Sequence, residues 1–139
     1  MKVAVDSSLL IAALITTEDG HDECHQVLET NECSAHIHAL AEVFNTLTGS
    51  RLGFRVPANE ATVMIRDELL PHLTCFELNA EEVIAAFEEA ERRGIRGGAV
   101  FDYLHLAAAK KALASKLYTL DAQDFRHFHR PGDPDIVQP

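Results

Sequence analysis

The sequence predicts an α/β fold, a three-layer sandwich in which a mostly parallel central sheet is flanked by helices. Two observations predict it. Short apolar runs of strand length alternate along the chain with longer segments of helical periodicity. The chain has 139 residues, 47% hydrophobic and 24% charged, which is typical of one globular domain with its own core. We therefore expect a single domain over residues 1–139.

Strands are expected where short apolar runs end at turn or capping residues. The first run, residues 2–6, stops at an Asp-Ser-Ser sequence, which is typical of a helix start. Further strands are predicted at residues 33–37, 73–78 and 116–121, and residues 136–137 are expected to add an edge strand.

Helices are expected between these runs. The clearest covers residues 39–48, where Leu40, Val43, Phe44 and Leu47 recur at the spacing of one helical face. Another begins at Asn79, which stands three residues before a glutamate at the spacing of a capping box. The helices are predicted over residues 9–15, 21–29, 39–48, 58–70, 80–93 and 100–115.

Two aspartates stand at the ends of predicted strands. Asp6 and Asp121 each follow an apolar run directly. In open parallel sheets, ligands bind outside the carboxyl ends of the strands, where loops and helix N-termini converge. If the two strands are neighbours, both carboxylates face one crevice. Each aspartate alone is more typical of a helix cap than of a catalytic site.

Asp102 is the more informative acid because it lies on an apolar helical stripe. It shares a face with Leu106, Ala109 and Leu113, which follow at i+4, i+7 and i+11. The helix dipole favours a charge in the first turn by about 0.3 to 1 kcal/mol. Partial burial of an unpaired carboxylate costs more than that. A bound cation would supply the missing compensation.

Glu42 lies on the side of its helix opposite the apolar stripe, on a polar face with Asn45, Thr46 and Gly49. This pattern fits either a solvated surface or a polar cleft. Acids that converge repel one another unless a divalent ion is present. Oxygen ligands without thiolates suit Mg²⁺ or Mn²⁺, and these ions assist phosphodiester hydrolysis.

The net charge of −10 is unusual for a protein that binds nucleic acid, because phosphate contacts normally use a basic surface. Carboxylates that bind a divalent metal are neutralised in the working enzyme. The basic residues also form local clusters, each of which is by itself more typical of a solvated helix surface. The clusters are Arg51 and Arg55; Arg92, Arg93 and Arg96; Lys110, Lys111 and Lys116; and Arg126 and Arg130.

The three cysteines are odd in number and form no CxxC pair, which argues against a disulfide framework and a zinc knuckle. We expect reduced thiols. His21 and His25 have a spacing that can serve a metal, although a polar helix face is the favoured interpretation. No segment approaches the roughly 18 to 20 apolar residues of a membrane span, and a polar Asp-Ser-Ser interrupts the apolar N-terminus. We expect a cytoplasmic protein without a membrane association.

Four short motifs in order resemble those of the PIN-domain ribonucleases, and within them the VapC-type toxins of toxin–antitoxin pairs. They are VDSSLL at residues 5–10, AEVFN at 41–45, FDYLHLAAA at 101–109 and TLDAQDF at 119–125. Each motif alone is weak, but together they span nearly the whole chain. The resemblance implies a PIN-like fold and cleavage of RNA with Mg²⁺ or Mn²⁺.

The resemblance also implies site residues and partners. An acidic pocket would contain Asp6, Glu42, Asp102 and Asp121, with Asp6 and Asp102 as the firmest metal ligands. Ser8 and Thr119 would hydrogen-bond the acids or a phosphate. Asp124 stands in the same motif as Asp121 and is an alternative fourth acid; Asp121 is favoured because it ends the predicted strand. The implied partner is a small antitoxin with a basic C-terminal segment. The apolar content of the helices between residues 58 and 93 leaves room for a homodimer face.

Two other functions fit parts of the pattern. In a receiver-like phosphotransfer domain, a strand-end aspartate such as Asp6 accepts phosphate. The sequence lacks the second acid at i+2 that is common in phosphatases of that type, and no lysine ends a predicted strand. A non-catalytic binding module with the same fold is the other alternative, and the presence of all four acids argues against it.

Overall fold

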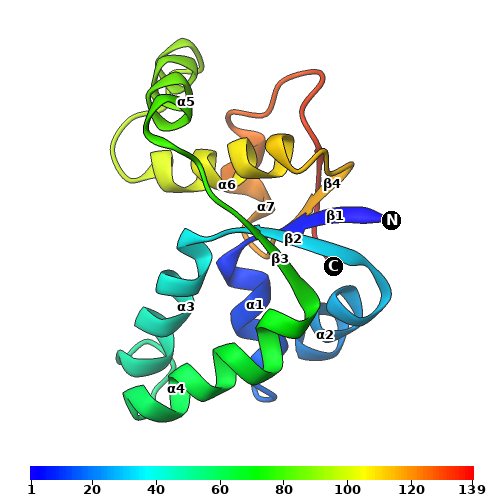
Figure 1. The fold of residues 1–139 in the computed structure, drawn as a ribbon, viewed down its shortest axis with the longest axis vertical. Coiled ribbons are helices and arrows are strands. Elements are labelled where there is room, and N and C mark those ends of the chain that lie inside the picture. The colour runs from blue at the N-terminus through cyan, green and yellow to red at the C-terminus, as the bar shows by residue number, and fades with distance from the viewer.

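The centre of the molecule is a five-stranded sheet in which all neighbouring strands are parallel (Figure 1). It is seen in a computed structural model that describes all 139 residues. The strand order is β3-β2-β1-β4-β5. The strands are β1 (Lys2–Val5), β2 (Glu32–His36), β3 (Leu73–Phe76), β4 (Lys116–Tyr118) and β5 (Asp135–Val137).

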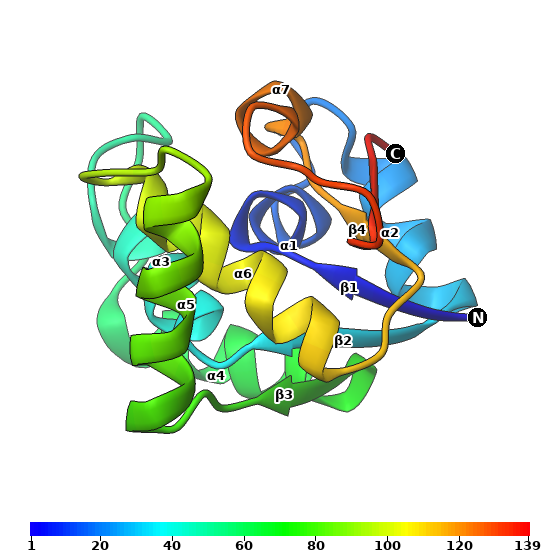
Figure 2. The same cartoon turned by 90° about the horizontal axis from the view of Figure 1, so that it is seen from above.

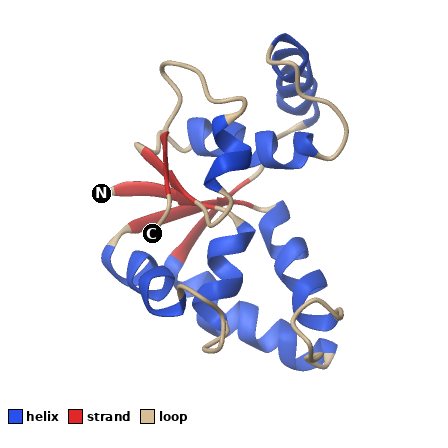
Figure 3. Ribbon diagram, turned by 180° about the vertical axis from the view of Figure 1, so that it is seen from behind, coloured by secondary structure: helices blue, strands red, loops and turns tan.

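Helices cover both faces of the sheet and make a three-layer sandwich, which confirms the predicted fold class (Figures 1 and 3). Helices α1 to α4 lie on one face, and α5, α6 and α7 lie on the other. The helices are α1 (Ser7–Leu14), α2 (His21–Thr30), α3 (His38–Thr48), α4 (Ala58–Met64), α5 (Ala80–Arg92), α6 (Ala99–Lys111) and α7 (Ala122–Arg126). None of them is long and apolar enough to cross a membrane.

The pleat of the strands divides the core between the two helical layers. Val3 and Val5 point to one side and pack with α1, α2 and α3, whereas Ala4 and Leu117 belong to a second cluster with α6 and α7. Successive side chains of a strand point to opposite faces, so a strand covered on both sides is apolar throughout. This is why the first strand contains no polar residue between Lys2 and Asp6.

Several element boundaries differ from the prediction for local reasons. Helix α6 ends at Lys111 rather than at residue 115, because Leu113 adopts a left-handed conformation with φ 58° and is 80% exposed. Leu113 is therefore not on the stripe of Asp102. Strand β4 ends at Tyr118, so Asp121 does not end it and instead precedes the short helix α7, which the sequence did not predict. Helix α4 continues as a π turn (Ile65–Leu69) before the 3₁₀ turn (Leu70–His72).

The order of the strands creates a switch point beside β1. The chain passes from β1 outward to β2 and β3, then returns to place β4 on the other side of β1 (Figure 2). Loops leave β1 and β4 in opposite directions at such a point, and ligands of open α/β sheets bind in the crevice between them. Asp6 and Asp121 thus follow neighbouring strands, which is the condition for their carboxylates to face one crevice.

Candidate active site

Asp6 follows β1 directly and is the N-cap of α1, with its side chain accepting a hydrogen bond from the Leu9 amide at 3.2 Å. It is 3% exposed. Ser8 Oγ donates to Asp6 Oδ1 at 2.6 Å, and Thr119 Oγ1 donates to Asp6 Oδ2 at 2.6 Å. The carboxylate is therefore both a cap and a group held in one orientation from two sides.

Ser8 and Thr119 also join the loops that leave β1 and β4. The Leu120 amide donates to Ser8 Oγ at 3.0 Å, and the Asp121 amide donates to Thr119 Oγ1 at 2.9 Å. Thr119 is fully buried. Both hydroxyls make the hydrogen bond to an acid that the resemblance implied, and the same two residues fix the path of the chain toward Asp121.

Asp102 lies in the first turn of α6 and is half-buried, with Leu106 and Ala109 of the same stripe fully buried. Burial, as the largest cause, and the charges of Asp6, Asp124 and Asp121 together raise the pKa of Asp102 to about 6, against a lowering effect of His105. The carboxyl group thus resists ionisation because it is desolvated and surrounded by other acids.

Asp121 and Asp124 both belong to this acidic cluster. Burial raises the pKa of Asp121, with further contributions from the charges of Asp6 and Asp124. Asp121 precedes α7 but makes no capping hydrogen bond with its side chain, and Asp124 lies in the first turn of that helix. The argument that favoured Asp121, its place at a strand end, is wrong, and the structure brings both acids close enough to act on Asp102.

Glu42 comes from α3 and reaches a histidine rather than another acid. His105 Nε2–H donates to Glu42 Oε1 at 2.7 Å. Burial disfavours the ionised form of Glu42, but the hydrogen bond and the charge of His105 outweigh this and lower its pKa. Of the predicted apolar face, Val43 and Leu47 are fully buried, whereas Phe44 is exposed. Ala39 takes the place of Phe44 on the buried face of α3, which is therefore rotated, and Glu42 lies at the edge of that face with its side chain 30% exposed.

His105 was not predicted as a site residue, although it lies in the third motif. It is buried in the middle of α6, three residues after Asp102. Residues three apart are neighbours on a helix surface. The sequence signal that could have identified His105 is its place between Leu104 and Leu106, three residues after an acid.

Both the chemistry and the placement of the acids decide whether they fit a divalent cation. Carboxylate oxygens are the ligands that Mg²⁺ and Mn²⁺ prefer, and the pKa values of Asp102 and Asp121 are raised first by burial and then by the charges of the neighbouring acids. As the side chains stand, no three His, Cys, Asp or Glu residues gather closely enough to hold a metal ion. The carboxylate oxygens are therefore suitable ligands for the cation, but the side chains in their present positions do not surround it.

Comparison with known proteins places the fold. No protein-family model matches the sequence, and no curated protein matches it. Solved structures match over the full length. VapC20 from Mycobacterium tuberculosis, a toxin that cleaves the sarcin–ricin loop, has 17% identity and a TM-score of 0.71 over 95% of this chain and 99% of that one. VapBC2 from Rickettsia felis, bound to a promoter DNA fragment, has 17% identity and a TM-score of 0.69 over 100% and 99%. DNA-bound VapBC from Salmonella typhimurium has 14% identity and a TM-score of 0.64 over 99% and 98%.

The chain has the fold of the VapC toxins. This confirms the PIN-like sandwich that the four motifs indicated. In this VapC-like fold, the helices and loops that carry the acids all meet at the switch point between β1 and β4.

In this VapC-like fold, a groove of about 430 Å³ includes acids of the cluster in its lining. Asp102, Asp124, Arg96 and His127 all line it. Arg93 also lines it, but its side chain is only 6% exposed and forms an ion pair with Asp133. Arg93 is thus not the solvated residue that its cluster suggested, and Arg96 is the basic residue of that cluster exposed in the groove.

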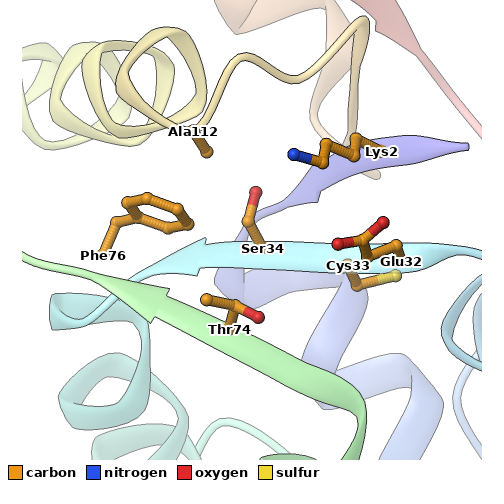
Figure 4. A pocket seen from close by; sticks show the side chains of 7 residues that line it. All are labelled: Lys2, Glu32, Cys33, Ser34, Thr74, Phe76 and Ala112. Carbon is orange, nitrogen blue, oxygen red and sulfur yellow. The ribbon is translucent and has the colours of Figure 1, made fainter.

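Three other features lie outside the acidic cluster. A cavity of about 190 Å³ opens between the sheet and the end of α6, with Lys2, Ser34, Phe76 and Ala112 around it (Figure 4). Lys2 begins β1, so the cavity includes the opposite end of that strand from Asp6. The histidines of α2 belong to a polar helix face, which was the favoured interpretation. The His21 ring hydrogen-bonds the Ala12 carbonyl, and His25 lies beside Glu29. All three cysteines are free.

Proposed function

We propose that this VapC-like chain is a metal-dependent endoribonuclease and the toxin of a toxin–antitoxin pair. The observation that carries the proposal is the cluster of Asp6, Asp102, Asp121 and Asp124 at the switch point, in which the pKa of Asp102 is raised to about 6. Such a cluster is costly unless it holds a cation. VapC20, which has the same fold, cleaves an RNA loop.

Each residue has a separate task in the proposed reaction. Asp6, fixed by Ser8 and Thr119, would hold Mg²⁺ or Mn²⁺ together with Asp102, and Asp121 or Asp124 would complete the set. When bound, the ion polarises the phosphodiester and lowers the pKa of the attacking water. Glu42, held at Oε1 by His105, orients that water on the side of the site formed by α3.

The groove beside the acids is the proposed path of the RNA. The groove is lined by Arg96, whose positive charge suits a phosphate, as well as by the acids Asp102 and Asp124. A phosphate adjoining the cleaved bond would therefore lie against Arg96. The positive charge of Arg96 in the groove reconciles an RNA substrate with a net charge of −10.

The proposed protein partner is a small antitoxin with a basic C-terminal segment. The acidic cluster and the net charge of −10 suit a basic inhibitor. The VapBC structures that share the fold are toxin–antitoxin complexes bound to DNA, which supports a partner of this class. We also propose that the chain is a homodimer and acts in the cytoplasm, in keeping with its exposed apolar helix surfaces and its free thiols.

The environment of Asp6 argues against the phosphotransfer alternative. It is almost fully buried and each oxygen already accepts a short hydrogen bond, which leaves a lone pair for a cation but hinders attack on a phosphodonor by the carboxylate as a nucleophile. Incubation with a phosphodonor and measurement of the intact mass distinguishes the two functions. A trapped aspartyl phosphate would favour the receiver-like alternative.

Cleavage of RNA by the purified chain tests the proposal. We expect cleavage with Mn²⁺, none with EDTA, and a loss of about 100-fold or more in Asp6→Asn and Asp102→Asn, because each removes one charge of the metal site. Asp67→Asn is the matched control, since Asp67 is exposed and pairs only with Arg66. Activity that persists in EDTA or in both site variants would contradict the proposal, and failure of the wild type to bind Mn²⁺ would favour a non-catalytic module.

A further inference from the structure

Glu42 and Asp102 come from different helices, and one side chain joins those helices beside the acids. His105 lies on α6 one turn after Asp102, and its Nε2–H donates to Glu42 Oε1 at 2.7 Å. The side chain of His105 is 2% exposed, whereas that of Glu42 is 30% exposed. A buried donor therefore holds a partly exposed acid.

We propose that His105 is a positioning residue that holds the Glu42 carboxylate in the orientation needed for cleavage, an inference that rests on the proposed ribonuclease function. A glutamate side chain has several rotatable bonds and, when free, populates many rotamers. A hydrogen bond to an ionised carboxylate is strong and directional. Because its donor is buried, Glu42 cannot turn into solvent without losing it. Helix α6 thus contributes Asp102 directly and controls Glu42 through His105.

The surroundings of His105 indicate that a histidine is needed at this position for its hydrogen bond to Glu42. It packs edge-on against the ring of His36, with centroids 5.9 Å apart and planes at 83°. Its other nitrogen, Nδ1, is buried without a hydrogen-bond partner. A buried unpaired nitrogen costs free energy that an apolar side chain would avoid. The one polar contact that the imidazole makes is with Glu42.

Three variants separate the hydrogen bond from packing. His105→Gln retains an N–H donor close to the position of Nε2, His105→Asn places it nearer to Nδ1 and too short to reach, and His105→Leu removes it. We expect Asn and Leu to lower kcat for RNA cleavage by about 10- to 100-fold with little change in KM, as is typical of residues that orient a catalytic group. Gln should restore most of kcat.

A double-variant comparison tests whether His105 acts through Glu42. In the Glu42→Ala background, the His105→Leu substitution should cause no further loss of kcat, because the group that it positions is already absent. A residue that only supports packing would lower kcat by the same factor in both backgrounds. The imidazole N–H of His105 provides a readout without RNA or metal: in NMR spectra of the free protein it should exchange slowly, and Glu42→Ala should abolish this protection.

The outcomes of this experiment are distinct. An unprotected N–H, full activity of His105→Asn and His105→Leu, or an equal loss in both backgrounds would overturn the positioning role while leaving the ribonuclease function in place. A wild type that cleaves no RNA with Mn²⁺ would overturn the ribonuclease function and the positioning role with it. If His105→Leu does not fold, the comparison of Gln with Asn decides the question alone.

Discussion

At the scale of single residues, the ionised carboxylate of Asp102 destabilises the metal-free fold, although the proposed reaction requires it. Its pKa is about 6 in the folded protein, compared with an ordinary value of 3.8. Because the folded protein binds the proton more tightly than the unfolded chain, the free energy of unfolding falls as the pH rises from about 4 to about 6. At neutral pH the carboxylate is ionised, ready for a cation, and unfavourable for the fold when alone.

Replacement of this charge should stabilise the protein while it removes activity. We expect Asp102→Asn to raise the free energy of unfolding at pH 7 by about 1 to 3 kcal/mol, because the asparagine has no charge to desolvate or repel. The gain should shrink toward pH 4, where wild-type Asp102 is protonated. Urea denaturation of the metal-free protein at both pH values measures it. An Asn variant no more stable than the wild type at pH 7 would refute the electrostatic account.

The residues of the site differ in how far the sequence could predict them. Asp6 and Asp102 are recognisable because their local patterns are unusual: one ends an apolar strand, and the other lies on an apolar helical stripe. The contact of Glu42 with His105 joins residues 63 positions apart, and no local pattern contains it. Asp124 was ranked below Asp121 because the end of β4 was placed three residues too late.

At the scale of elements, the end of α5 and the C-terminal loop are joined by a buried ion pair beside the groove. Arg93 pairs with Asp133, whose side chain is 2% exposed, and also with Glu89. The Arg93 guanidinium lies 5.1 Å from the centre of the Tyr103 ring on α6. These contacts fix the turn between α5 and α6 that carries Arg96 into the groove.

Removal of Arg93 should destabilise the fold far more than removal of its neighbour. We expect Arg93→Ala to lower the free energy of unfolding by about 2 to 3 kcal/mol, because the buried Asp133 loses the guanidinium and keeps only the more exposed Lys110 as a charged partner. Arg92 is exposed and pairs only with Glu89, so Arg92→Ala should change stability by less than about 1 kcal/mol. Thermal and urea unfolding compare the two variants. Equal effects would show that the buried pair is not what holds this turn.

Element boundaries were predictable where a local rule fixes them. The capping box of Asn79 and Glu82 is present at the start of α5, as the spacing indicated. Helix α7 was missed because its five residues are too few to show a helical period. The early end of α6 depends on the left-handed conformation of Leu113, which a leucine rarely adopts and no pattern predicts.

At the scale of the whole molecule, α5 stands away from the sheet and packs on α6 (Figure 1). Its apolar residues Ile84 and Phe87 are exposed. Such side chains are typical of an interface, because apolar surface removed from water stabilises association. The proposed homodimer would use this helix.

Polar replacement on α5 tests this dimer. We expect the double variant Ile84→Ser, Phe87→Ser to weaken self-association by about tenfold or more, because two buried apolar side chains are lost from the interface. Leu113→Ser, at the exposed end of α6, is the matched control and should leave it unchanged. Sedimentation equilibrium measures both. A monomeric wild type, or a double variant that associates as the wild type does, would exclude α5 as the dimer face.

The central claim is that the clustered acids exist to bind a divalent cation, and calorimetric titration of Mn²⁺ into the purified chain tests it most directly. At pH 7 we expect saturable binding by the wild type and by Asp67→Asn, and at least tenfold weaker binding by Asp102→Asn. A wild type that binds no Mn²⁺ at millimolar concentration, or an Asp102→Asn variant that binds it equally well, would contradict the claim.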